Sequence, residues 1–130
     1  MSVIAIIGSV VVALAALLHV YIFVLESVRW MQPSTWRIFN VRDEEQAETL
    51  RPMAYNQGFY NLFLAIGAAA GLVLYFEGSL PYAARALILF TTACMAAAAI
   101  VLTTTGRAYL RPALVQGTLP LIGFALFLFA

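Results

Sequence analysis

The sequence predicts an all-α protein, a bundle of four transmembrane helices that forms a single domain over residues 1–130. Of the 130 residues, 64% are hydrophobic and 10% are charged. An average soluble domain is about half apolar and about a quarter charged. A soluble fold of this length could not bury so much apolar surface, so the solvent that fits this composition is lipid. The apolar residues also fall into four separate runs without the alternation of membrane strands, which favours helices.

Each apolar run is close to the roughly 20 residues that a helix needs to cross a bilayer core. The runs cover residues 3–25, 59–76, 82–102 and 113–130. No basic residue precedes the first run, and it is longer than the apolar part of a signal peptide, so a membrane helix is favoured over a cleaved signal. The connections EGSLPY and GRAYLRP are short, so neighbouring helices are expected to be antiparallel.

One sizeable polar insert, residues 30–53, separates the first two runs. Its middle, DEEQAETL, begins with acidic residues that complement the dipole at the start of a helix. We therefore expect a short amphipathic helix in this loop, lying on the membrane surface. Pro52 is expected near the start of the second membrane helix, where a missing N–H costs little. Trp30 and Trp36 fit the aromatic belt at a membrane interface.

The basic residues predict the orientation, because arginines near helix ends favour the cytoplasmic side. Six of the seven lie in two connections on one side, and only Arg85 lies on the other. Both termini are therefore expected to face away from the cytoplasm. With a net charge of +1 and no basic patch, nucleic acid is not expected as a partner. Cys94 is the only cysteine, so it forms no disulfide within the chain.

Polar side chains within the apolar runs gather toward the side that carries most arginines. Glu26 and His19 are seven residues apart and share a helix face, as do Gln57 and Asn61, four apart. Because amide and charged side chains are costly in lipid, we expect these faces to point into the bundle. They would line a polar cavity that opens to the cytoplasm and binds a small or amphiphilic ligand. The candidate ligand-binding residues are His19, Glu26, Asn56, Gln57, Tyr60, Asn61 and Gln116.

A structural interpretation competes with this one, because amides also bond across membrane helices and hold them together. Glu26 stands apart, since an ionisable acid inside a membrane segment is by default a functional hypothesis. His19 and Glu26 supply two metal ligands where catalytic zinc usually has three, so we expect no metal and no cofactor. The GxxxG match at Gly67 and Gly71 is common in membrane helices and leaves homo-oligomerisation open.

Three motifs, HVYIFVLESVRW (19–30), NQGFYN (56–61) and VQGTLPLI (115–122), resemble a bacterial integral-membrane family of unknown function numbered 1304. The resemblance covers nearly the whole chain, and NQG-x-YN is its most specific part. It implies a four-helix protein of the bacterial inner membrane and brings no established activity. It singles out His19, Glu26, Trp30, Asn56, Gln57, Gly58, Tyr60, Asn61, Gln116 and Gly117.

A fainter similarity is to the membrane-associated glutathione and eicosanoid enzymes, which are also small four-helix proteins. Arg51 followed by Asn56, and the pair Arg107-x-Tyr109, carry it. It implies thiol conjugation or isomerisation of a lipophilic substrate, with Arg51, Arg107 and Arg111 holding an anion. Residues 57–61 depart from the carboxylate-bearing motif of those enzymes. A third alternative is a structural or accessory membrane subunit.

Overall fold

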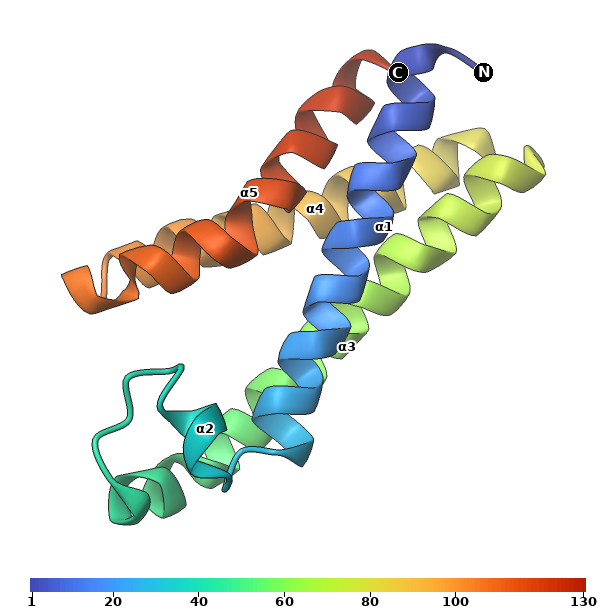
Figure 1. Cartoon of the computed structure of the whole chain (residues 1–130). Helices are drawn as coiled ribbons and strands as arrows, with labels where there is room; N and C mark the ends of the chain where they lie inside the picture. Colours follow the sequence, from blue (N-terminus) through green and yellow to red (C-terminus); the bar gives the residue numbers. More distant parts are fainter.

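The computed structural model of the chain describes residues 1–130 and contains helices but no strands (Figure 1). Four helical stretches are long and apolar enough to cross a membrane: Val3–Val28, Glu44–Glu77, Pro81–Thr103 and Arg107–Phe129. The predicted all-α fold with four membrane helices is therefore confirmed, and the chain has the features of a multi-pass membrane protein.

The chain forms its elements in a simple order. They are α1 (Val3–Phe23), the π-helical turn η1 (Val24–Val28), the single turn α2 (Pro33–Trp36), α3 (Glu44–Glu77), α4 (Pro81–Thr103), the 3-10 turn η2 (Arg107–Tyr109) and α5 (Leu110–Phe129). Both termini and the turn between α3 and α4 lie at one end of the molecule, which we call the terminal end (Figure 1). Six of the seven arginines lie toward the other end, which we call the arginine end.

The start of α3 differs from the sequence prediction. The expected short surface helix and the second membrane helix are one continuous helix of 34 residues, with Pro52 inside it. Proline removes one backbone hydrogen bond from a helix. The helix continues because Ala47 and Ala54, seven residues apart on one face, are both buried against Trp30 and Trp36. The tertiary contact on either side of Pro52 thus outweighs the lost bond.

Asp43 caps this long helix. Its side chain accepts a hydrogen bond from the backbone N–H of Gln46 at 2.8 Å, and Glu44 and Glu45 follow in the first turn. Acidic groups at this position complement the helix dipole, as the sequence predicted. The Gln46 N–H, and then Arg42, hold the pKa of Asp43 below its usual value.

Glycines mark the places where the helices approach most closely. A Cβ at Gly71 of α3 would lie 3.1 Å from the backbone nitrogen of Ile88 in α4. At Gly123 of α5 it would lie 2.9 Å from Val12 in α1. The GxxxG pair of α3 therefore serves packing within the chain, where small residues let membrane helices approach. The core between the helices consists of Val12, Ala15, Ala16, Ala65, Ala68, Ile88, Met95 and Phe127.

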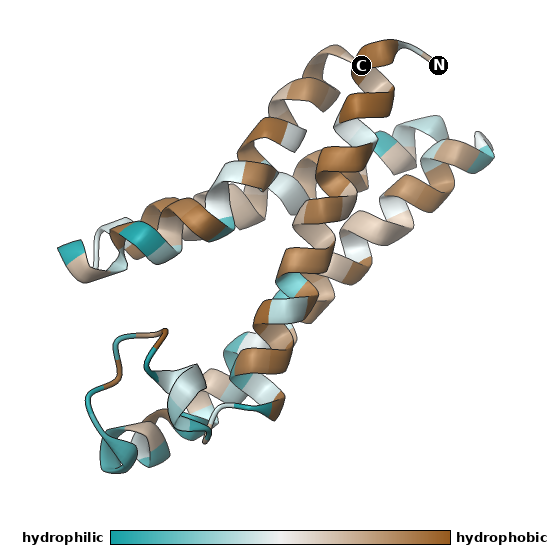
Figure 2. Cartoon of the chain, viewed as in Figure 1, coloured by the Kyte–Doolittle hydropathy of each residue, from teal (hydrophilic) through white to brown (hydrophobic).

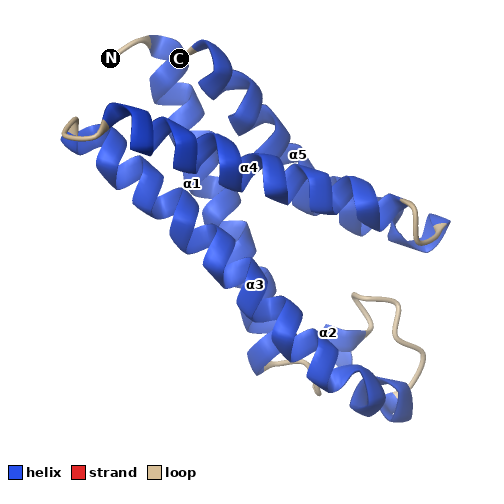
Figure 3. Cartoon of the chain, turned by 180° about the vertical axis from the view of Figure 1, so that it is seen from behind, coloured by secondary structure: helices blue, strands red, loops and turns tan.

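The four helices separate into two pairs toward the arginine end. There η1 and the end of α1 pack on α3, whereas α4 packs on α5 (Figures 1 and 3). One side-chain hydrogen bond joins the two pairs at this end, from Asn40 Nδ2 to the backbone oxygen of Ala108 at 3.1 Å. Asn40 lies in the segment between α2 and α3 and has a left-handed backbone, with a φ of 60°.

The hydropathy pattern agrees with a membrane setting. Hydrophobic residues cover much of the four long helices, and hydrophilic residues concentrate around α2 and the first turns of α3 (Figure 2). Large apolar side chains such as Leu17, Phe63 and Phe90 are more than half exposed along the helices. Such outward-facing apolar surface is expected where lipid is the solvent.

Candidate functional site

Glu26 is the centre of the candidate site. It lies in the π-helical turn η1, and only 6% of the residue is exposed. Asn61 of α3 donates a hydrogen bond from Nδ2 to Glu26 Oε1 at 3.0 Å, and the same amide nitrogen donates to the backbone oxygen of Gln57 at 3.1 Å. The fold thus joins Glu26 to Asn61. Single π-helical turns within α-helices are rare and frequently occur at functional sites.

Three further contacts hold the Glu26 turn against α3. Ser27 Oγ donates to the backbone oxygen of Tyr55 at 2.8 Å, and Trp30 Nε1 donates to that of Ala47 at 2.9 Å. A Cβ at Gly58 would lie 3.0 Å from the backbone nitrogen of Ser27. Gly58, one of the residues of the NQGFYN motif, therefore faces a neighbouring helix. Ser27 was not singled out from the sequence, although a small polar residue beside the acid was a usable signal.

His19 lies deeper on the same helix and does not contact Glu26 by a hydrogen bond. Only 1% of it is exposed, and its Nδ1 bonds with the backbone oxygen of Ala15 at 2.8 Å. Trp36 Nε1 is the only buried side-chain polar atom in the chain without a hydrogen-bond partner. His19 Nε2 and Glu26 Oε2 make no hydrogen bond within the chain.

The remaining polar candidates on α3 are more exposed than expected. Asn56, Gln57 and Tyr60 are all exposed, and none of their side chains makes a hydrogen bond. These three side chains are therefore not packed between helices in the isolated chain. The physical reason is the separation of the helix pairs toward the arginine end. It leaves the first half of α3 without α4 beside it (Figures 1 and 3).

Helix geometry shows which way this face points. Gln57 lies close to the face of α3 that carries Gly71, because a spacing of 14 residues is nearly four whole turns. Gly71 packs directly on Ile88 of α4. Toward the start of α3, however, α4 no longer lies beside it (Figure 3). Gln57, in the first half of α3, therefore faces the space between the two pairs, whereas Asn61 bonds to Glu26 within one pair.

Gln116 faces the same space from the other pair. It is partly buried on α5, seven residues before Gly123, and these two residues share a face. Gly123 packs on Val12 of α1, whereas toward the start of α5 the helix α1 no longer lies beside it (Figure 1). No hydrogen bond joins Gln116 to the residues of α1 or α3. The structure brings Glu26 and Asn61 together and leaves Gln116 apart.

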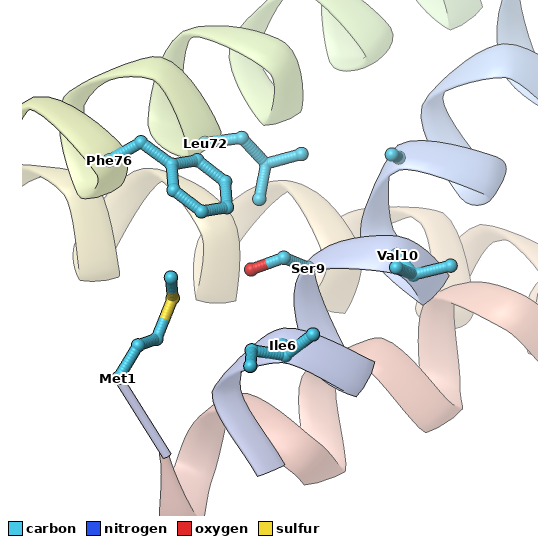
Figure 4. A pocket seen from close by; sticks show the side chains of 7 residues that line it. Met1, Ile6, Ser9, Val10, Leu72 and Phe76 are labelled. Atoms are coloured by element: carbon cyan, nitrogen blue, oxygen red, sulfur yellow. The ribbon is translucent and has the colours of Figure 1, made fainter. Parts of the chain in front are cut away.

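Two apolar grooves lie elsewhere, between α1 and α3. The first, of about 480 Å³, is near the terminal end and includes Met1, Leu72 and Phe76, with Ser9 as its one polar side chain (Figure 4). The Ser9 hydroxyl donates to Ala5 of its own helix. The second, of about 460 Å³, is lined entirely by apolar residues. Neither groove contains a predicted site residue, so the expected polar cavity is not one of them.

The arginines that an anion-binding enzyme would use do not converge. Arg51 lies 3.7 Å from Glu48 of its own helix, whereas Arg107 and Arg111 are exposed at the end of the α4–α5 pair. No group of three or more His, Cys, Asp or Glu side chains is placed to hold a metal ion.

A protein-family model, described as a protein of unknown function, matches residues 13–128 of the chain. No curated protein and no solved structure matches the chain.

Proposed function

Since the chain belongs to the DUF1304 family, as its three motifs indicated, and this family has no known function, we propose a function from the geometry. The protein binds an amphiphile between its two helix pairs, at the arginine end. The observation that carries this proposal is Glu26, which is buried in a π-helical turn, bonded on one oxygen to Asn61 and free on the other.

Amide side chains that line a binding site differ from amides that hold helices together, because the former have no hydrogen-bond partner within the protein. If the amides only held helices together, each would bond to a neighbouring helix. Asn61 does so, but Gln57 and Gln116 make no side-chain hydrogen bond and face the space between the pairs from opposite sides. Polar groups without a partner cost free energy in lipid. A polar head group between the pairs would satisfy them, and its apolar chain would lie among the exposed apolar side chains of the helices.

Photocrosslinking tests this proposal. The protein, reconstituted in phosphatidylcholine bilayers, is exposed to a monoacylglycerol that carries a diazirine next to its head group, and the crosslinked residues are mapped by mass spectrometry. We expect saturable labelling near Gln57 and Gln116, because both face the proposed site. An excess of unlabelled monoacylglycerol should abolish this labelling, while labelling at Phe90, exposed on α4 and outside both apolar grooves, should not saturate.

A matched pair of variants sharpens the result. Gln57→Leu removes a polar group from the proposed site, and Thr49→Leu makes a similar change on the exposed first part of α3. The first variant should weaken saturable labelling and the second should leave it unchanged. Uniform labelling of all outward-facing residues, without saturation, would show that the space between the pairs is ordinary lipid-facing surface.

We also propose that the arginine end lies in the cytoplasm of a bacterial cell and that the protein is in the inner membrane. The distribution of arginines supports this orientation, with Arg85 alone at the terminal end. Cysteines introduced as Glu45→Cys and Ser79→Cys, each in a Cys94→Ala background, report it, since both positions are exposed. A membrane-impermeant thiol reagent added to whole spheroplasts should label only the second variant. If the reagent labels only the Glu45→Cys variant, the protein has the opposite orientation.

A further inference from the structure

We infer that the amphiphile carries a cationic, hydrogen-bond-donating head such as an amine, for which Glu26 is the counter-ion. This inference rests on the proposed function and adds the chemical class of the ligand. It follows from the acidic group of Glu26 at the site and from the arginines, none of which pairs with it.

No cation of the protein accompanies Glu26. The two ion pairs of the chain are Arg42 with Asp43 and Arg51 with Glu48, both exposed. Arg29, one turn further along the chain, donates instead to Gln32 at 2.8 Å. The one side chain that bonds to Glu26 is the neutral amide of Asn61. The carboxyl group therefore has no compensating charge from the chain.

The other polar side chains that face the space are neutral, so the site as a whole carries at most one negative charge. A carboxylate held in a poorly solvated place is strongly disfavoured unless a cation is paired with it. Ionisable acids within membrane segments accordingly mark ion pathways or ligand counter-ions. An ammonium group would compensate this charge, whereas a sulfate or phosphate head would be repelled.

The geometry leaves room for one more bond at Glu26. Asn61 occupies Oε1, and Oε2 has no hydrogen-bond partner in the chain. An ammonium N–H donating to Oε2 would form a charge-assisted hydrogen bond, which is roughly twice as strong as a neutral one. Gln57, one turn before Asn61 on α3 and with an unpaired side-chain oxygen, offers a further acceptor for the remaining N–H groups.

Three probes with one apolar chain and different heads test the inference. Diazirine-bearing dodecylammonium, dodecanol and dodecyl sulfate are titrated onto the reconstituted protein, and saturable crosslinking gives an apparent affinity for each. We expect the ammonium probe to bind roughly tenfold or more tightly than the alcohol, and the sulfate to bind least. Glu26→Gln should remove this preference. It keeps an oxygen acceptor for Asn61, so the variant is expected to fold.

Glu77→Gln is the matched control. Glu77 is the last residue of α3, at the terminal end, and is exposed, so this variant loses the same charge away from the site. It should keep the preference for ammonium. Equal binding of ammonium and alcohol, or a preference that survives Glu26→Gln, overturns the inference while leaving an amphiphile site in place. Absence of saturable crosslinking by all three probes overturns the proposed function itself.

Discussion

Gly58→Leu is expected to cause the largest loss of stability of any single change in the chain. A Cβ at this position would lie 3.0 Å from the backbone nitrogen of Ser27, which cannot rotate away as a flexible side chain would. The helices would have to separate, and the hydrogen bond from Ser27 to Tyr55 would be lost with them. Overpacking of this kind costs about 3 kcal/mol, and more where backbone must move. Reversible unfolding in mixed detergent micelles, followed by circular dichroism, measures the change.

Tyr60→Leu is the control for Gly58→Leu. Tyr60 is 62% exposed, two residues along the same helix, and its side chain makes no hydrogen bond. Its replacement should change the free energy of unfolding by less than about 0.5 kcal/mol, as is usual for surface positions. A Gly58→Leu variant as stable as the Tyr60→Leu variant would show that α1 and α3 do not meet closely at Ser27.

The second large effect is expected at the Glu26–Asn61 hydrogen bond. Asn61→Leu leaves Oε1 of a buried carboxyl group without its donor, and such a loss costs about 2–3 kcal/mol. Glu26→Leu should cost less, about 1 kcal/mol, because the Asn61 amide keeps its bond to the backbone of Gln57. The same detergent unfolding experiment ranks the two variants.

The double variant Glu26→Leu/Asn61→Leu tests directly whether the two side chains interact. When both partners become apolar, no buried polar group is left unpaired, and the cost can be close to zero. The double variant should therefore be more stable than Asn61→Leu alone. Gln57→Leu combined with Glu26→Leu serves as control and should be additive, since these side chains do not bond. Additive losses for the first pair as well would mean that Glu26 and Asn61 do not interact in the folded protein.

Local composition determined the architecture. The apolar runs alone predicted the four long helices, since a backbone in lipid must satisfy its hydrogen bonds within each segment. Short connections predicted the antiparallel order. The family resemblance singled out Gly58, and the structure places it at a helix contact; glycine is costly within a helix and is kept where neighbours approach closely. These properties depend on neighbours in sequence or on the solvent, so they can be read without coordinates.

Contacts between distant segments decided the rest. Three features depend on residues far away in sequence. They are the π-helical turn at Glu26, the continuation of α3 across Pro52, and the hydrogen bond from Ser27 to Tyr55. Polarity alone grouped Asn56 and Gln57 with Asn61, yet only Asn61 bonds to the acid. Seven-residue spacing placed side chains on a common face, but which helix covers that face, and where the helices diverge, follows from packing. The tertiary structure therefore selected Glu26 and Asn61 as a bonded pair and directed Gln57 and Gln116 toward the space between the helix pairs.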